Sequence, residues 1–275
     1  MLSYRHAFHA GNAGDVLKHS VLGFCLSYLG KKDKPYTYID THAGAGGYSL
    51  NRGFAAKNRE WEAGIARITA DETVRACPLF GPYFSVLGRD FPDNDWYPGS
   101  PLIAQTLLRG QDEAFCFELH RADFTLLQEN LGKDRRFHPR NEDGLGALKG
   151  LLPPRSGRGC VFIDPSYEMK TDYEQIPQAL AMGIRRFPAG VYIIWFPLLN
   201  RREAREFPAV LMELYQGNRC CVTLQTSPVP PSERGMYGSG LAVFNPPWVL
   251  KEALEESLPA LAAALGGSWR LSWTD

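Results

Sequence analysis

The sequence predicts an α/β protein in which helices cover both faces of a mostly parallel, seven-stranded sheet. Three observations carry this prediction. Apolar strand-like runs alternate with helical ones after residue 98, which is typical of parallel sheets. A loop containing Gly44, Gly46 and Gly47 follows the first strand-like run. Between that loop and residue 98 the alternation stops, which indicates an insertion.

The first part of the chain predicts one helix, one strand and the insertion. Apolar residues recur at helical spacing over 15–29, and Gly30 ends that helix. The strand covers 36–40. Gly, Pro, Asn and Asp then punctuate the sequence around two probable helices, 60–68 and 78–87. We therefore expect an inserted helical subdomain at 48–97. The main domain would comprise 1–47 and 98–275, with 1–20 as an N-terminal segment.

After Pro98 the alternation continues to the C-terminus. Ser100 is placed to cap a helix whose first position is Pro101. Apolar runs predict strands at 114–118, 136–141, 159–164, 190–196, 220–226, 241–245 and 269–273. Helical spacing predicts helices at 100–109, 121–130, 173–187 with an interruption near Pro177, 201–215 and 250–265. Residues 227–240 read as a loop.

Composition limits the classes of function. The 30 basic and 30 acidic residues give a formal net charge of zero, so a nucleic-acid partner would need a local basic face. The six cysteines form no C-x-x-C pair, which argues against zinc. We expect no signal peptide, no membrane span, no bound metal and a cytoplasmic location.

The most informative motif is Asp164-Pro165-Ser166-Tyr167, which follows the apolar run 160–163. Ligands of open α/β sheets bind beyond the carboxyl ends of the strands. The Asp164 carboxylate and the Pro165 carbonyl can accept hydrogen bonds from an exocyclic amino group of a base. The Tyr167 ring can stack on that base once it has flipped out. These residues are therefore the predicted catalytic set.

A second constellation predicts a nucleotide-type cofactor. Asp40 and the glycines Gly44 and Gly46 form an acid-x-x-x-Gly-x-Gly loop, which lets the backbone approach S-adenosylmethionine. Glu118 ends the next strand, where an acid commonly binds ribose hydroxyls, and Asp143-Gly144 follows the one after. A tight turn and solvated strand-end acids are the alternatives for each motif alone. Four acidic strand ends in chain order favour the cofactor site.

Asn245-Pro246-Pro247-Trp248 matches the catalytic tetrapeptide pattern better than Asp164–Tyr167 does. Too little chain follows it to build the substrate side of a sheet, and the glycine loop comes early in the chain. We therefore interpret this second tetrapeptide as the structural end of a late strand.

The segment from Tyr4 to His19 is dense in histidine, aromatic and basic residues, which is unusual for a disordered tail. Together with Asp40–Gly46, 97–101, 164–173, 234–236 and 245–248, it resembles the RlmJ-type family of bacterial 23S ribosomal RNA adenine-N6 methyltransferases over nearly the whole chain. Ser166 departs from that family's Asp-Pro-Pro-Tyr.

The resemblance implies a Rossmann-like class I methyltransferase fold with a small inserted helical subdomain. It implies that the S-adenosylmethionine site is lined by His19, His42, Ser100, Glu118, Asp143, Gly144 and Asp164. It also implies that Tyr4 contacts the RNA and that His6 and Lys18 lie near the target adenosine. The expected partner is 23S ribosomal RNA, protein-free or in an early assembly precursor, bound by a monomer.

Three other functions remain open at this point. Methylation of adenine N6 in DNA would use the same chemistry. A methyltransferase-like nucleic-acid binding protein, involved in the use of external DNA, would explain Ser166 as a sign of lost catalysis. A nicotinamide-dependent oxidoreductase leaves the Asp164 tetrapeptide unexplained and is the weakest of the three.

Overall fold

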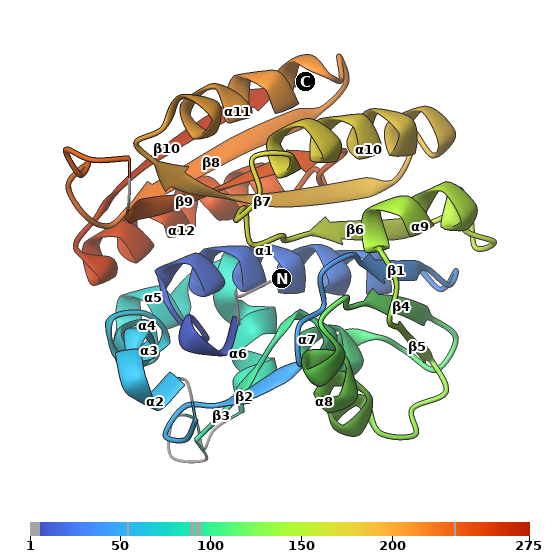
Figure 1. The fold of residues 1–275 in the computed structure, drawn as a ribbon, viewed down its shortest axis with the longest axis horizontal. Helices are drawn as coiled ribbons and strands as arrows, with labels where there is room; N and C mark the ends of the chain where they lie inside the picture. Colours follow the sequence, from blue (N-terminus) through green and yellow to red (C-terminus); the bar gives the residue numbers. More distant parts are fainter. Residues whose placement is uncertain (1–5, 54, 89–90, 92–94, 234) are drawn as a thin grey trace.

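The computed structural model describes residues 6–53, 55–88, 91, 95–233 and 235–275. Its central sheet has eight strands in the order β10-β8-β9-β7-β6-β1-β4-β5 (Figure 1). The parallel strands are β1 (Thr37–Asp40), β4 (Glu113–Phe117), β5 (Phe137–Arg140), β6 (Gly159–Ile163) and β7 (Val191–Leu199). The antiparallel pairs join β7 to β9 (Met236–Phe244), β9 to β8 (Arg219–Gln225) and β8 to β10 (Ser268–Thr274). The predicted α/β fold is confirmed, and every strand range predicted from the sequence forms a strand of this sheet, which makes it eight-stranded rather than seven-stranded.

Two layers of helices cover the sheet. One layer contains α1 (Ala13–Gly30), α7 (Ser100–Leu107), α8 (Arg121–Leu131) and α12 (Leu250–Leu265). The other contains α9 (Gly144–Leu151), α10 (Asp172–Arg186) and α11 (Arg202–Glu213). The sequence did not predict α9. The interruption predicted near Pro177 is wrong, because α10 continues past Pro177, which lies inside the helix, to Arg186.

The inserted residues begin and end in a two-stranded antiparallel ribbon. Its strands, β2 (Gly47–Ser49) and β3 (Trp96–Pro98), pair Tyr48 with Tyr97. The helical turns between them are α2 (Ala55–Asn58), α3 (Glu60–Ala63), α4 (Ile65–Ala70), α5 (Glu72–Ala76), η2 (Pro78–Phe80) and α6 (Gly81–Leu87). They pack against α1 and α12 (Figure 1). The division of the chain into two domains stays a prediction.

Helix α1 is buried almost all round, because the sheet lies on one side and the inserted helices lie on the other. Asn12 caps its start by accepting a hydrogen bond from the Asp15 backbone N–H. The buried side includes the polar residues Asp15, Lys18, His19 and Ser20. Buried charges need partners. The interior beside these residues of α1 must therefore contain other polar groups. None of the helices among the described residues is long and apolar enough to span a membrane.

Strand β9 is longer than the sequence predicted, since it begins at Met236 inside the expected loop 227–240. The glycines that suggested a loop are needed for close packing in the sheet. A Cβ on Gly238 would lie 2.3 Å from the Leu224 carbonyl oxygen, and one on Gly240 would lie 2.2 Å from the Phe196 ring. Glycine in a strand interior often marks such an approach.

The tetrapeptide at Asn245 follows β9 and lies at the sheet edge opposite to Asp164, because β9 runs antiparallel to β7. The Asn245 side chain is fully engaged there. Its Oδ1 accepts from the Tyr215 hydroxyl at 2.7 Å, and its Nδ2 donates to the carbonyls of Pro188 at 2.6 Å and Gly190 at 2.9 Å. These bonds support the structural interpretation of this tetrapeptide.

We predict that Asn245→Ala lowers the free energy of unfolding by about 1–3 kcal/mol, because it removes hydrogen bonds to Tyr215, Pro188 and the buried Gly190. Asn245 also has a φ of +50°, so Asn245→Gly, which removes the same bonds without backbone strain, should be less damaging. Urea unfolding of the three proteins measures both effects. The activity of the folded fraction should not change, and a specific loss of activity would contradict the structural interpretation.

Candidate functional site

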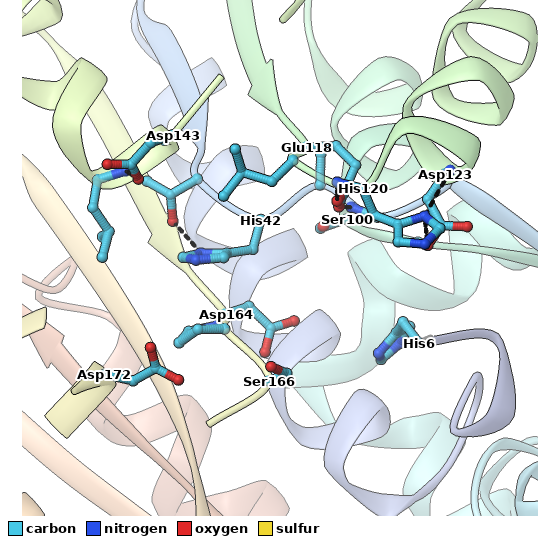
Figure 2. Close-up of a pocket in the computed structure, with 18 of the residues that line it drawn as sticks. His6, His42, Ser100, Glu118, His120, Asp123, Asp143, Asp164, Ser166 and Asp172 are labelled. Carbon is cyan, nitrogen blue, oxygen red and sulfur yellow. Dashed lines mark hydrogen bonds and ion pairs between the residues drawn. The ribbon is translucent and has the colours of Figure 1, made fainter. Parts of the chain in front are cut away.

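A pocket opens at the carboxyl ends of β1, β4, β5 and β6 (Figure 2). It brings together most of the residues that the sequence singled out, although they lie up to 159 positions apart, from His6 to Pro165. These lining residues are His6, His19, His42, Gly44, Ser100, Glu118, Asp143, Gly144, Asp164 and Pro165. No group of three or more His, Cys, Asp or Glu side chains in the described part of the chain is arranged to hold a metal ion.

The glycine loop after β1 is tied to the end of β4. The Gly44 backbone N–H donates to Glu118 Oε2 at 2.9 Å, and the His120 N–H donates to Glu118 Oε1 at 2.6 Å. Burial raises the pKa of Glu118, and these backbone bonds counteract part of that effect. Each carboxylate oxygen can accept more than one hydrogen bond, so Glu118 keeps capacity for a ligand hydroxyl.

Gly46 does not line the pocket, although the sequence predicted a cofactor contact there. Its carbonyl accepts from the Gly99 N–H at 2.8 Å, and its φ is +80°. This left-handed conformation favours glycine. The structure therefore supports a role for Gly46 in shaping the loop rather than in touching a ligand.

The start of α9 places Asp143 and Gly144 against the same loop. Asp143 caps the helix by accepting from the backbone N–H groups of Leu145 at 3.0 Å and Gly146 at 3.2 Å. A Cβ on Gly144 would lie 2.3 Å from the Thr41 carbonyl oxygen. Only glycine fits at that approach, which brings the ends of β1 and β5 together.

Asp40 is fully buried beneath the loop and does not line the pocket. Burial raises its pKa to about 6, and hydrogen bonds from Ser100 and Tyr38 hold that rise in check. Its carboxylate also accepts from the His42 N–H at 3.3 Å. Asp40 therefore organises the first turn of the loop from inside. Burial lowers the pKa of His42 to about 4, so this lining histidine is neutral at pH 7.

His19 projects from α1 to the pocket and ends a buried chain of hydrogen bonds. Its Nδ1 lies 2.8 Å from the Tyr97 hydroxyl, which lies 2.7 Å from the Tyr83 hydroxyl. Burial lowers the pKa of His19 to about 3. A neutral ring held at one nitrogen presents the other nitrogen in a fixed direction. The insertion, through Tyr83 and Tyr97, thus helps to build the site.

Asp164 is paired with Lys18. Lys18 Nζ lies 2.7 Å from Asp164 Oδ2 and 2.8 Å from Asp15 Oδ1. Burial raises the pKa of Asp164, while Lys18 and His6 lower it, and the pKa remains above its ordinary value. Burial would lower the pKa of Lys18, but the two carboxylates raise it above its ordinary value. Lys18 is therefore a buried ammonium ion.

His6 lies at the mouth of this cluster, in the turn η1 (His6–Phe8). Its Nε2 lies 3.0 Å from Asp15 Oδ2, and its ring meets the Tyr48 ring edge-on at a centroid distance of 5.3 Å. His6 lines the pocket, and its position beside the substrate stays a prediction. Tyr4, the other predicted RNA contact, lies outside the described residues.

Tyr167 does not have the orientation that stacking on a base requires. Its side chain is 2% exposed, and its ring packs among Tyr173, Trp195 and Phe207. Its hydroxyl donates to the Trp195 carbonyl at 2.6 Å. The sequence prediction of a stacking ring disagrees with this geometry, because an aromatic residue can satisfy the motif while facing the core.

Arg201, between β7 and α11, holds the same turn from outside. Its Nη2 donates to the Tyr167 carbonyl and to the Tyr173 hydroxyl, both at 2.9 Å. Its guanidinium also lies over the Tyr173 ring, 4.9 Å from the centroid. Tyr167 has a φ of +53°, a conformation that costs free energy for a residue other than glycine. These contacts stabilise the turn that carries Asp164.

The sequence missed several lining residues. Thr41 and Tyr48 belong to the glycine loop and the ribbon, and Asp123 pairs with His120 at the start of α8. The full set of missed lining residues is Thr41, Ala43, Tyr48, Gly99, Leu119, His120, Asp123, Leu145, Ser166, Met169, Asp172 and Gln175. The only available signal was position in the sequence, since half of these residues adjoin a residue that was predicted.

Comparisons with known proteins agree with this geometry. A family model described as RsmJ, ribosomal RNA large subunit methyltransferase D, RlmJ, matches residues 33–275. Ribosomal RNA large subunit methyltransferase J of Escherichia coli K12 is 42% identical over 96% of this chain and 94% of its own length. The protein of the same name from Haemophilus influenzae Rd is 39% identical over 99% of both chains.

A solved structure shows the same fold. The crystal structure of protein LPL1258 from Legionella pneumophila superposes with a TM-score of 0.86 at 33% identity, covering 96% of this chain and 98% of that one. The resemblance seen in the sequence is therefore confirmed, and the chain belongs to the RlmJ family of ribosomal RNA large subunit methyltransferases.

Proposed function

We propose that this protein transfers a methyl group from S-adenosylmethionine to the N6 amino group of a specific adenine in 23S ribosomal RNA. The observation that carries the proposal is the Asp164 carboxylate. It stands beside the Pro165 carbonyl, at the floor of a pocket whose far end holds Glu118 and Asp143. The family membership supports the same reaction class.

The pocket residues fit the proposed cofactor. Glu118 has acceptor capacity for two ribose hydroxyls, and Asp143 lies where an adenine amino group would need an acceptor. Gly44, His42, Ser100 and His19 surround the section between these acids and Asp164. Bound there, S-adenosylmethionine would supply an electrophilic methyl group.

The chain's own contribution to the reaction is to raise the nucleophilicity of the target nitrogen. The N6 lone pair is delocalised into the adenine ring. Asp164 Oδ2 is held by Lys18, so Oδ1 can accept a hydrogen bond from the amino group, and the Pro165 carbonyl can accept the second. Both bonds favour a pyramidal nitrogen. The carboxylate also stabilises the positive charge that develops there and accepts the departing proton.

In this arrangement Tyr167 does not stack on the base. It acts by holding the turn that carries Asp164 and Pro165. Its buried ring and Arg201 fix the peptide that carries the two acceptors. Positioning of reacting groups accounts for a large part of enzymatic rate enhancement. The buried ring therefore serves the same reaction by holding the geometry of Asp164 and Pro165.

The proposed partner is 23S ribosomal RNA, protein-free or in an early assembly precursor, bound by a monomer in the cytoplasm. A deep pocket requires an extruded base, and extrusion costs least where the RNA is not yet locked by proteins. Arg201, Arg202 and Arg205 follow β7 on the pocket side of the sheet. Arg185 and Arg186 end α10, near the opposite end of the sheet strands.

Asp164→Asn should lower kcat by about 10²–10⁴-fold, because the amide neither carries the charge nor accepts the proton. Methyl transfer to protein-free 23S ribosomal RNA measures this loss, and duplex DNA assayed in parallel tests the rival DNA substrate. S-adenosylmethionine binding and thermal unfolding serve as controls for the fold. Near-normal turnover by Asp164→Asn would refute the mechanism, and preferential methylation of DNA would refute the substrate.

The pH dependence of kcat should show an acid limb above the ordinary pKa of aspartate. Burial disfavours the Asp164 carboxylate, so the side chain takes up a proton at a higher pH than in a peptide. Activity is present where Asp164 is ionised and is lost as the pH falls through its raised pKa. Single-turnover rates measured across the pH range test this sign. A rate that stays constant down to pH of about 4 would contradict it.

Ser166→Pro should change kcat less than tenfold. Proline at this position would restrict the turn and contribute about 0.4–1 kcal/mol of pre-organisation. Neither acceptor would change, and the turn is already held by Tyr167 and Arg201. Steady-state kinetics of the variant measure the effect. A hundredfold gain would show that Ser166 limits the rate far more than this geometry indicates.

A further inference from the structure

One carboxylate beneath the pocket has several partners and no role in the mechanism above. Asp15, in the first turn of α1, is 1% exposed. Its Oδ2 accepts from the Gly11 backbone N–H at 2.8 Å and lies 3.0 Å from His6 Nε2. Its Oδ1 lies 2.8 Å from Lys18 Nζ. A single side chain therefore joins the N-terminal turn to the ion pair at the active site.

Lys18 is confined between two carboxylates and an aromatic ring. Its Nζ lies 2.8 Å from Asp15, 2.7 Å from Asp164 and 5.0 Å from the centroid of Trp195. Lysine has a flexible stem and an ammonium group without a preferred direction. Its position is therefore set by its partners. Without Asp15, the ammonium would keep only one anionic partner.

We propose that Asp15 is a positioning residue, which holds Lys18 against one oxygen of Asp164 so that the other oxygen faces the amino group of the base. The inference rests on the proposed function and extends it to a residue that never touches the substrate. Asp15 acts through Lys18. Because Asp15 also binds Gly11 and His6, it ties the geometry of the catalytic carboxylate to the N-terminal turn.

The direction in which the pKa of Asp164 changes when Asp15 is removed distinguishes a positioning role from a simple charge effect. Titratable groups around Asp164 are Lys18 and Asp15 of α1, His6 of η1 and Asp40 of β1. Lys18 lowers the pKa of Asp164 more strongly than the negative charge of Asp15 raises it. If Asp15 were only a nearby charge, its removal would lower the pKa of Asp164. If Asp15 holds Lys18 in place, its removal displaces Lys18 and raises that pKa.

The test uses two substitutions in the full-length protein. Asp15→Asn removes the charge at nearly constant shape, and Asp15→Glu keeps the charge but moves it by one methylene group. Both should lower kcat by about a hundredfold, the effect of a displacement near 1 Å, with little change in KM for S-adenosylmethionine. The acid limb of kcat should move to higher pH in both. The pKa of Asp40 is set by burial, Ser100, Tyr38 and Asp164, and Asp15 is not among the groups that shift it. Titration of Asp40 itself should therefore affect the pH profiles of the wild-type protein and of both variants equally.

Asp112→Asn is the matched control. Asp112 is also buried and ion-paired, with its Oδ2 2.9 Å from Arg109 Nε, but it lies near the starts of β1 and β4. This control should lower the melting temperature without altering kcat or the pH profile. If Asp15→Asn fails to fold, Asp15→Glu decides the question, because it retains the ionic partner.

Two results would overturn the inference: wild-type kcat in Asp15→Glu, or an acid limb that moves to lower pH in Asp15→Asn. Failure of the proposed function would look different. In that case the wild-type protein itself would transfer no methyl group to 23S ribosomal RNA, whereas failure of the Asp15 role would appear only in the variants.

Discussion

The parallel pairing of β1 with β6 is the constraint on which the site depends. It aligns Asp40 with Phe162, so the glycine loop and the catalytic turn leave the sheet side by side. On the other side of β1, pairing with β4 brings Glu118 to the same edge. Neither contact is local in sequence. The register of these ladders, rather than any single motif, converts four separate strand ends into one pocket.

The second determinant is the burial of α1. A helix enclosed by a sheet and an inserted subdomain would ordinarily be apolar, yet Asp15, Lys18 and His19 lie on its buried surface. Ion pairing compensates part of the cost of removing these charges from water, and such clusters are seldom favoured for stability alone. Under the proposed function, we attribute their presence to the ion pair between Lys18 and Asp164. The helices between β2 and β3 complete the enclosure of α1.

The sequence predicted the fold class and 10 of the 22 residues that line the pocket, because alternation, glycine loops and strand-end acids are local signals. It failed where tertiary packing decides. The glycines of β9 indicated a loop, but they admit the neighbouring Phe196 ring and Leu224 carbonyl. The Tyr167 ring has the residue type expected for stacking, although its direction depends on an aromatic cluster from distant elements. The partners of Lys18 could be identified only from the folded structure, which shows what this face of α1 contacts. Asp15 belongs to no sequence motif that would have singled it out.

Because the Tyr167 side chain is buried, the turn that carries Asp164 is anchored in the hydrophobic core. Phe207 lies on α11, more than 40 positions along the chain from Asp164, yet its ring meets both Tyr167 and Tyr173 at right angles. Catalytic precision in this protein is therefore inherited from ordinary side-chain packing. Serine at position 166 leaves this anchoring intact, because Tyr167 holds the turn from the core. Phe207 does not line the pocket, yet its packing supports the turn that carries Asp164.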